Sequence, residues 1–207
     1  LISATNALGQ TTMFSDHNAD GYAEKIVTPN NQITTLTYDS RQRLTGSTTE
    51  ARTTELIYDS FGNISKIINP DGTFSLYEYD TVQRLVKISD ISGNFISYTL
   101  DAAGNPLSTE IFDDSGILRQ KQTATYDELS RLIKLYGAQS QETQYSYDAN
   151  NNLISLTDAK GGVWLKSVDA LERLVQATDA KTGLTHYTYD EHNRLVSLSD
   201  PKGNTTT

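Results

Sequence analysis

Apolar and polar side chains alternate along short stretches of this chain with a period of two. Tyr77 and Tyr79 flank Glu78, and after a short polar gap Val86 and Ile88 follow with one residue between them. Such alternation predicts β-strands with one apolar and one polar face. No stretch has a persuasive helical period, so the pattern predicts an all-β protein with almost no helix.

The strands recur at a fixed interval. An aromatic or apolar residue followed by Asp occurs eight times, with the acid at Asp39, Asp59, Asp80, Asp101, Asp127, Asp148, Asp169 and Asp190. Successive members are 20, 21, 21, 26, 21, 21 and 21 positions apart. Five residues after each acid stands Leu, Ile or Pro, and Arg or Asn comes directly before that residue. A fixed period of this length is typical of a tandem-repeat architecture.

Each period contains two turn signals. Asp at the first position with Gly three residues later favours a type I turn followed by a left-handed residue, which closes a β-hairpin. The predicted turn glycines are Gly62, Gly93, Gly104, Gly161 and Gly203. Elsewhere the left-handed position falls on Asn151 and Asn193, or on Gln42, Gln83, Ser130 and Glu172, which are less comfortable there.

These signals predict one array of about eight hairpins over residues 1–207, with residues 1–37 diverged. The single step of 26 residues predicts a longer hairpin at about 107–124, a place suited to contact with cargo or a partner. Open sheets of more than about ten strands curl or close. The expected fold is therefore a curved, spiralling antiparallel sheet that forms a segment of a hollow shell.

Composition narrows the possible functions. The chain has 26 acidic and 17 basic residues, a formal net charge of −9, and no cysteine. The acidic balance argues against binding a nucleic-acid backbone, and the lack of cysteine excludes disulfides and thiolate sites. No apolar run is long enough for a transmembrane helix. The chain starts without Met and ends within the repeat pattern, so we expect a fragment of a longer protein.

Candidate catalytic chemistry is sparse. The repeated aspartates are spread one per hairpin, whereas Ca²⁺ needs six to eight oxygens at one point and a glycosidase needs two carboxylates across a cleft. The histidines, His17, His186 and His192, accompany no recognisable catalytic motif. We therefore predict a protein that is not an enzyme, with no metal and no cofactor.

Two sets of side chains suggest other roles. If the hairpins stack in register, Arg43, Arg84, Arg131, Arg173 and Arg194 would each lie near the turn aspartate of the next hairpin and form a ladder of charge-assisted bonds. The tyrosines of the strands would form either a glycan-binding strip or a row of cross-strand packing contacts. This strip comprises Tyr77, Tyr79, Tyr98, Tyr145, Tyr147, Tyr187 and Tyr189.

The repeat resembles the YD repeat of Rhs proteins, seen intact in Tyr58-Asp59-Ser60-Phe61-Gly62-Asn63-Ile64. The resemblance implies hairpins that coil into a hollow shell, often around a C-terminal toxin in bacteria; toxin-complex subunits, wall-associated proteins and teneurins share the architecture. Rhs proteins also carry an Asp-Pro-x-Gly-Leu self-cleavage motif. Asp200-Pro201-Lys202-Gly203 is similar, but Asn204 replaces the Leu, so we expect an ordinary repeat turn there.

The expected function is that of a structural, encapsulating segment of a secreted or exported bacterial polymorphic toxin. Its expected partners are the rest of the shell and the enclosed C-terminal toxin polypeptide. The alternative is adhesion to cell-surface glycans.

Overall fold

The computed structural model describes residues 2–207, and within this range the chain consists of strands and turns with no helix. The chain forms two compact units. The first extends to Tyr98 and includes Ile111–Arg119, and the second comprises Thr99–Glu110 and Gln120–Thr207. The all-β prediction, with tandem hairpins in a curved antiparallel sheet, is confirmed.

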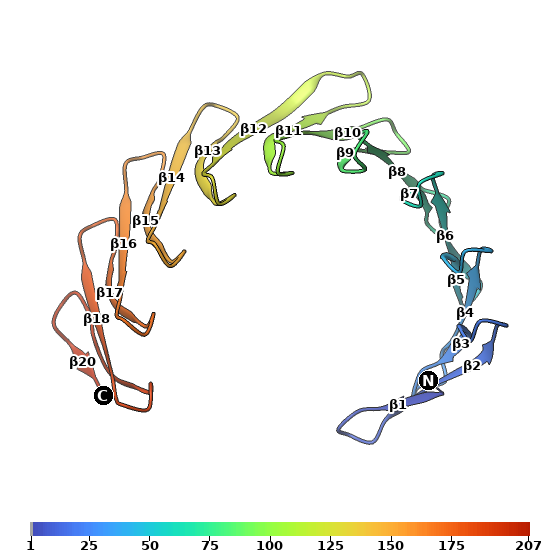
Figure 1. Ribbon diagram of the computed structural model, residues 1–207, viewed down its shortest axis with the longest axis horizontal. Coiled ribbons are helices and arrows are strands. Elements are labelled where there is room, and N and C mark those ends of the chain that lie inside the picture. The colour runs from blue at the N-terminus through green and yellow to red at the C-terminus, as the bar shows by residue number, and fades with distance from the viewer. Residues whose placement is uncertain (1) are drawn as a thin grey trace. The chain divides into compact units, whose positions relative to one another are not determined.

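Strands of the first unit follow one another along the chain and curve progressively (Figure 1). They are β1 (Ser3–Thr5), β2 (Thr11–His17), β3 (Ala23–Val27), β4 (Ile33–Tyr38), β5 (Leu44–Thr49), β6 (Arg52–Tyr58), β7 (Ile64–Ile68), β8 (Phe74–Tyr79), β9 (Leu85–Asp90) and the beginning of β10 (Phe95–Leu100). From β1 to β10 each strand pairs antiparallel with the next.

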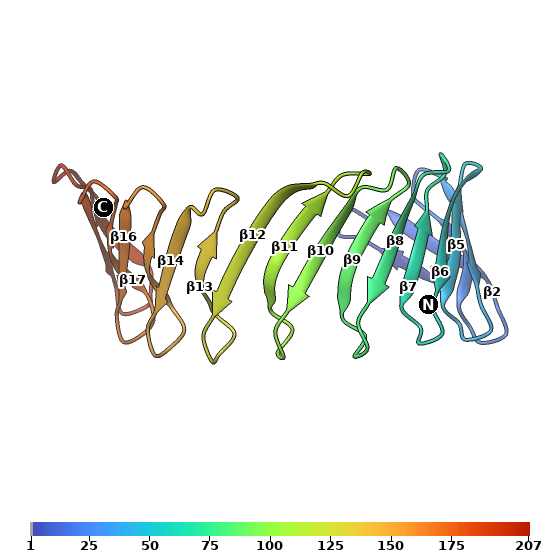
Figure 2. The same ribbon diagram turned by 90° about the horizontal axis from the view of Figure 1, so that it is seen from above.

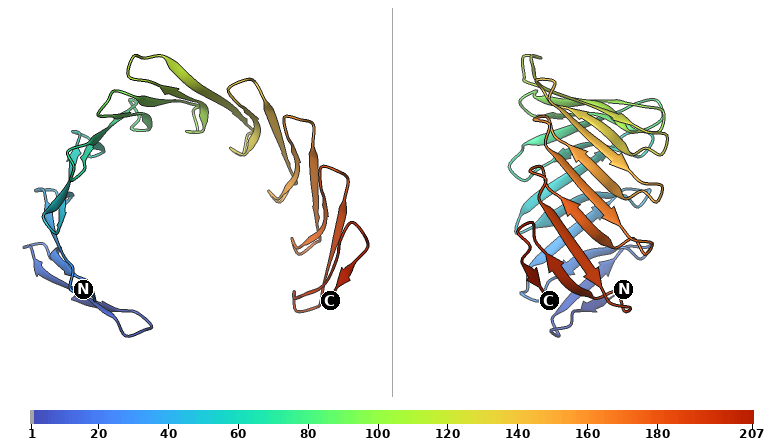
Figure 3. Two further views of the ribbon diagram at one scale, coloured as in Figure 1. Left: turned by 180° about the vertical axis from the view of Figure 1, so that it is seen from behind. Right: turned by 90° about the vertical axis from the view of Figure 1, so that its left-hand side faces the viewer.

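The second unit repeats the same plan (Figure 3, right). Its strands are β13 (Leu132–Tyr136), β14 (Glu142–Tyr147), β15 (Leu153–Thr157), β16 (Val163–Val168), β17 (Leu174–Thr178), β18 (Leu184–Tyr189), β19 (Leu195–Ser199) and β20 (Thr205–Thr206), preceded by most of β11 (Pro106–Phe112) and β12 (Leu118–Tyr126). From β12 to β20 each strand again pairs antiparallel with the next. The 26-residue step falls in the β11–β12 hairpin, where β12 has nine residues.

Turns lie at both ends of the strands (Figure 2). We call the turns that begin at the eight repeated aspartates, together with the one at Asn18, the corner turns, and those at the other strand ends the opposite turns. In a corner turn the first residue pairs with the fifth, as in Asp127 N–H to Arg131 C=O at 3.0 Å. The opposite turn at Asp200 has the same geometry, with Asp200 N–H donating to the carbonyl of Asn204 at 2.9 Å.

A β-bulge accompanies seven of the corner turns. The register shifts between Ile57 and Tyr58 where β6 pairs with β7, and the same shift occurs beside Tyr38, Tyr79, Tyr126, Tyr147, Val168 and Tyr189. Bulges increase local twist and bend the bulged strand. Because the shifts lie at the corner ends of the strands, they bend each unit in a repeated manner.

Neither unit has a thick hydrophobic core. Within residues 2–207 Ala124 is the only buried apolar side chain, with 8% of its surface exposed, and Trp164 is 37% exposed. The strands are therefore held by backbone ladders and by cross-strand pairs such as Tyr145 with Leu156. In so thin a structure, contacts between consecutive hairpins carry much of the stability.

Candidate functional site

A corner turn is organised by its aspartate. Oδ1 of Asp127 accepts hydrogen bonds from the backbone N–H groups of Leu129 (2.9 Å) and Arg131 (3.0 Å). Oδ2 accepts from Nε of Arg131 at 2.7 Å, and Nη2 completes the ion pair at 2.7 Å. Arg43, Arg84, Arg173 and Arg194 pair in the same way with Asp39, Asp80, Asp169 and Asp190. In the turns at Asp59, Asp101 and Asp148, an Asn amide replaces the guanidinium.

These bonds stabilise the charged carboxylates. The backbone N–H of Arg131 contributes most to lowering the pKa of Asp127, and it outweighs the desolvation that acts in the opposite direction. At Asp59 desolvation is the largest influence, yet the hydrogen bonds from Asn63, Gly62 and Phe61 together lower the pKa. The pKa is lowered at all eight repeated aspartates. They are thus ionised turn residues whose oxygens already accept local donors, an arrangement unsuited to a general acid.

The fourth corner residue has a left-handed backbone. The φ angles are 63° at Gln42, 67° at Gln83, 60° at Ser130, 71° at Asn151, 62° at Glu172 and 64° at Asn193. Gly62 and Gly104 occupy the same position with φ of 104° and 94°. A side chain there costs backbone energy, so its presence calls for a compensating contact.

That contact comes from the preceding corner. Nη1 of Arg131 donates to Oδ1 of Asn151 at 2.8 Å and to the carbonyl of Asp148 at 3.2 Å. Nη1 of Arg173 bonds Asn193 in the same way at 2.8 Å. Where Asn replaces Arg, its amide reaches the same position, as in Asn105 Nδ2 to Ser130 Oγ at 3.0 Å. At Gln42, Gln83, Ser130, Asn151 and Asn193 the left-handed side chain is therefore an acceptor for the corner before it.

This geometry corrects one part of the predicted ladder. Arg131 and Arg173 do reach the turn aspartate of the next hairpin, at its backbone carbonyl, but the carboxylate that each of them pairs with belongs to its own turn. The reason is the backbone pairing of the first and fifth corner residues, which places their two side chains next to each other. The link to the next hairpin passes instead through a backbone carbonyl and a neutral side chain.

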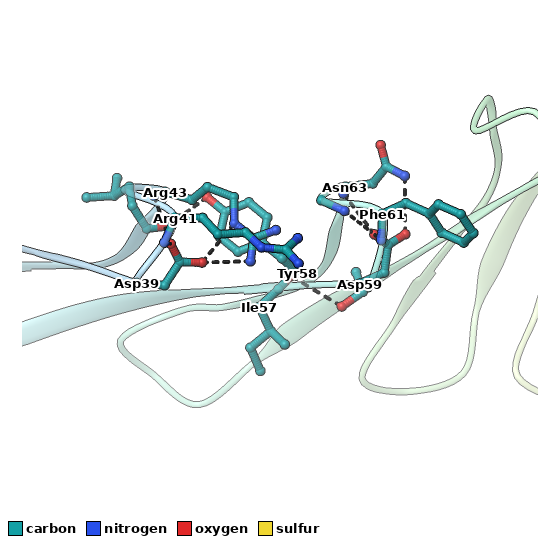
Figure 4. A network of polar contacts seen from close by, with 11 residues as sticks. Asp39, Arg41, Arg43, Ile57, Tyr58, Asp59, Phe61 and Asn63 are labelled. Carbon is teal, nitrogen blue, oxygen red and sulfur yellow. Dashed lines mark hydrogen bonds and ion pairs between the residues drawn. The ribbon is translucent and has the colours of Figure 1, made fainter.

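The corner at Arg43 lacks one of these contacts. The next left-handed residue is Gly62, which has no side-chain acceptor, and Nη1 of Arg43 is buried without a hydrogen-bond partner. Its guanidinium carbon lies 4.2 Å from the centre of the Tyr58 ring. Figure 4 shows this ring between the two corner turns, with Ile57 on the other side of the strand. Arg131 and Arg173 lie over Tyr147 and Tyr189 at 4.8 Å, so the same cation–π contact recurs.

A tyrosine precedes six of the eight corner aspartates and joins two hairpins. The hydroxyl of Tyr147 donates to the carbonyl of Leu132 at 3.0 Å, fifteen residues earlier in the chain. The same bond is made by Tyr38 to Ala23, Tyr58 to Leu44, Tyr79 to Ile64, Tyr126 to Pro106 and Tyr189 to Leu174. Burial raises the pKa of Tyr79, and the Asp59 carboxylate raises it further, so the donating proton is retained.

The predicted tyrosine strip consequently divides into two rows. Tyr79, Tyr147 and Tyr189 use their hydroxyls to tie hairpins together. Tyr77, Tyr145 and Tyr187 lie two residues earlier and pair across the sheet with Ile88, Leu156 and Leu198. Tyr98 lies on β10 at the corresponding position. The hydroxyls of this second row form no hydrogen bond within residues 2–207.

The sequence analysis did not predict one of the corner turns. Asn18 begins a turn in which its N–H bonds the carbonyl of Tyr22 at 2.9 Å. The Tyr22 ring lies 5.5 Å from that of Tyr38, in the position that Arg43 takes over Tyr58. The spacing contained the signal, because Asn18 precedes the first repeated aspartate by one repeat length of 21 residues.

Among the hollows on the strands, two are larger than the others. One of about 370 Å³ is lined in part by Asp59, Phe61 and Tyr77, and Phe61 is 76% exposed. The other, of about 380 Å³, lies beside Trp164 on β16.

No group of three or more His, Asp or Glu side chains gathers into a metal-binding cluster in the described part of the chain. Over the same residues, no helix is long and apolar enough to cross a membrane.

Comparison with solved structures shows the same fold in much larger proteins. The crystal structure of TcdB2-TccC3-TEV is 14% identical with a TM-score of 0.58, and it aligns with 98% of this chain but only 14% of its own. A Tc holotoxin pore from Photorhabdus luminescens, with a mutation in TccC3, is 14% identical with a TM-score of 0.61 and aligns with 98% and 13%. No curated protein matches the chain.

The family comparison is specific to the repeat. The sequence model of the RHS Repeat family matches residues 58–94, 126–163 and 169–205, which together make up more than half of the chain. Each matched segment begins at or next to a corner aspartate and includes the following opposite turn. The chain therefore belongs to the RHS-repeat family, and its corner-linked hairpins are RHS repeats.

Proposed function

We propose that this chain is part of the wall of a secreted or exported bacterial toxin, and that the wall encloses a C-terminal toxin polypeptide. The observation that carries the proposal is the repeated link between hairpins. A tyrosine hydroxyl, an Arg or Asn side chain and a left-handed acceptor join consecutive corners. Such links hold neighbouring hairpins in a fixed arrangement, which is what a structural wall requires.

The likeness to TcdB2-TccC3 structures supports the proposal that the chain is part of a wall, because those structures share the hairpin fold. The corner aspartates support a structural role as well, since their oxygens bind the backbone of their own turn. The proposed partners are further repeats of the same wall and the enclosed polypeptide. We propose no nucleic-acid partner, because the net charge of −9 opposes phosphate binding.

Limited proteolysis of the longer protein tests enclosure. A polypeptide that follows the repeats should resist trypsin in the intact protein and be cleaved rapidly when produced alone. The paired substitution Tyr147→Phe with Arg131→Ala loosens a corner and should raise the cleavage rate, whereas Tyr145→Phe should leave it unchanged. Equal cleavage rates for the attached and the free polypeptide would overturn the proposal.

Glycan binding is a second candidate, and one observation favours it. The hollow beside Phe61 and Tyr77 combines aromatic surfaces with Ser65, Thr81 and Gln83, a mixture that suits sugar rings and hydroxyls. A glycan array probed with this chain tests it. Binding that is lost in Phe61→Ala or in Tyr77→Ala would support adhesion, and an array without specific binding would dismiss it.

A further inference from the structure

One hairpin departs from the others on the face that carries the tyrosines. Three residues before the corner aspartate the other hairpins have Tyr, Leu or Ala, but the hairpin that ends at Asp169 has Lys166. The residue directly before the aspartate is Val168 in place of the usual tyrosine. Across the sheet, Lys166 pairs with Ala177, whereas Tyr145 pairs with Leu156. Val168 and Ala177 reduce the volume that fills this face, and Lys166 replaces an apolar or aromatic side chain with a charged one.

The same hairpin has gained an aromatic ring. Trp164 lies five residues before the corner aspartate, where most other hairpins have Ser or Thr, and it pairs with Leu156. It does not fill the space that is left. A hollow of about 380 Å³ remains beside it, with Leu153, Ile154 and Leu156 along its wall and Trp164 37% exposed.

The polar groups of the hollow are few and opposite in charge. Lys166 lines it and forms no ion pair with any carboxylate among residues 2–207. Asp158 also lines it; Oδ1 of Asp158 accepts from the N–H groups of Lys160 (2.9 Å) and Gly162 (2.8 Å). Its Oδ2 faces no donor within the described residues.

We propose that this hollow, the β16 pocket, binds a polypeptide segment that presents a bulky apolar side chain next to a carboxylate. The apolar side chain packs on Trp164 and the leucines, the carboxylate pairs with Lys166, and a backbone N–H of the segment donates to Oδ2 of Asp158. Apolar walls with a few oriented polar groups are typical of such sites. A sugar would leave most of its hydroxyls without partners there, and a fatty acid has no donor for Asp158.

Binding at the β16 pocket does not depend on the proposed enclosure. Trp164 is the only tryptophan of the chain, so its fluorescence reports directly on the pocket. The probe is the peptide acetyl-Gly-Phe-Asp-Gly-amide, with analogues in which Ala replaces Phe or Asn replaces Asp. We expect a saturable shift of tryptophan emission, with binding about tenfold weaker for the Ala peptide and about fivefold weaker for the Asn peptide.

Three variants make the test specific, and calorimetric titration gives a second readout. Lys166→Tyr restores the residue common at this position and fills the pocket, so binding should disappear while the far-ultraviolet circular dichroism stays that of the parent. Lys166→Gln should abolish the preference for the Asp over the Asn peptide. Lys181→Tyr, in an opposite turn, should bind as the parent does. Unsaturable titration, equal binding by Lys166→Tyr, or stronger binding of dodecanoate or cellobiose than of the peptide would overturn the proposal.

Discussion

Arg131 donates a hydrogen bond from Nη1 to Oδ1 of Asn151, 2.8 Å away in the next corner turn. The same guanidinium pairs with Asp127 in its own turn and lies over the ring of Tyr147. The Arg131 side chain therefore closes its own turn, packs on the next hairpin and donates a hydrogen bond to the left-handed residue of that hairpin's corner turn. The backbone strain at Asn151, with φ of 71°, is offset by a contact between repeats.

A double-mutant cycle measures this link. We expect Arg131→Ala and Asn151→Ala to destabilise the chain and to couple by about 0.5–1 kcal/mol, because the bond is charge-assisted but partly exposed to water. Urea unfolding of the single and double variants gives the coupling free energy. Arg131→Ala combined with Asn193→Ala serves as the control and should be additive. Additivity of the Arg131 and Asn151 substitutions would show that the bond contributes nothing.

Gly62 offers the complementary experiment, because Nη1 of Arg43 is buried beside it without an acceptor. Gly62→Asn and Gly62→Ala both place a Cβ at positive φ, but only Asn supplies an acceptor. We expect the Asn variant to be more stable than the Ala variant by about 1 kcal/mol. The intrinsic preference of Asn for this backbone is measured by the same two substitutions at Gly72, where a Cβ meets nothing within 4 Å. Equal Asn–Ala differences at the two sites would rule out the new bond.

The two tyrosine rows should respond differently to loss of the hydroxyl. Tyr79→Phe leaves the carbonyl of Ile64 without its donor and should lower the free energy of unfolding by about 1 kcal/mol. Tyr77→Phe removes a hydroxyl with no partner in the described chain and should be close to neutral. Thermal unfolding of the two variants tests the distinction. A cost at Tyr77 as large as that at Tyr79 would contradict it.

Acid should destabilise the fold. Hydrogen bonds from Arg131, the backbone N–H first, lower the pKa of Asp127 below its value in an unfolded chain, about 3.9. The folded state then binds fewer protons, so the stabilisation is complete above the unfolded pKa and is lost as pH falls through the folded pKa. We expect the urea midpoint to fall between about pH 5 and pH 2, and less steeply in Asp127→Asn. A midpoint that holds or rises towards pH 2 would contradict this.

Much of the fold follows from the spacing of the Tyr-Asp pairs. Alternation around Glu78 predicted a strand with two faces, and β8 has that form. The turn signals predicted hairpins because Asp and Gly have local preferences that act within four residues. Asn18 was missed because it lacks the tyrosine and the aspartate, although its spacing marks it.

What the sequence did not predict depends on contacts between repeats. Glu50 and Ala51 form a two-residue turn with φ of 50° and 62°, although neither residue favours that backbone. The carboxylate that pairs with Arg131 was assigned to the next repeat, since the choice between two aspartates depends on the pairing at the corner; from Asp148 of that repeat it is the backbone carbonyl that Arg131 bonds. The β16 pocket also has no local signal in the sequence, because it depends on how the side chains of adjacent strands fill one face of the sheet.

The link between consecutive corners is tested most directly by hydrogen–deuterium exchange of Tyr147→Phe against Tyr145→Phe. If the hydroxyl of Tyr147 holds its hairpin to the carbonyl of Leu132, its loss should speed exchange in both corners, at residues 127–132 and at 148–152, and Tyr145→Phe should leave both at the parent rate. Exchange that rises only next to residue 147, or equally in the two variants, would contradict a structure whose repeats are joined at their corners.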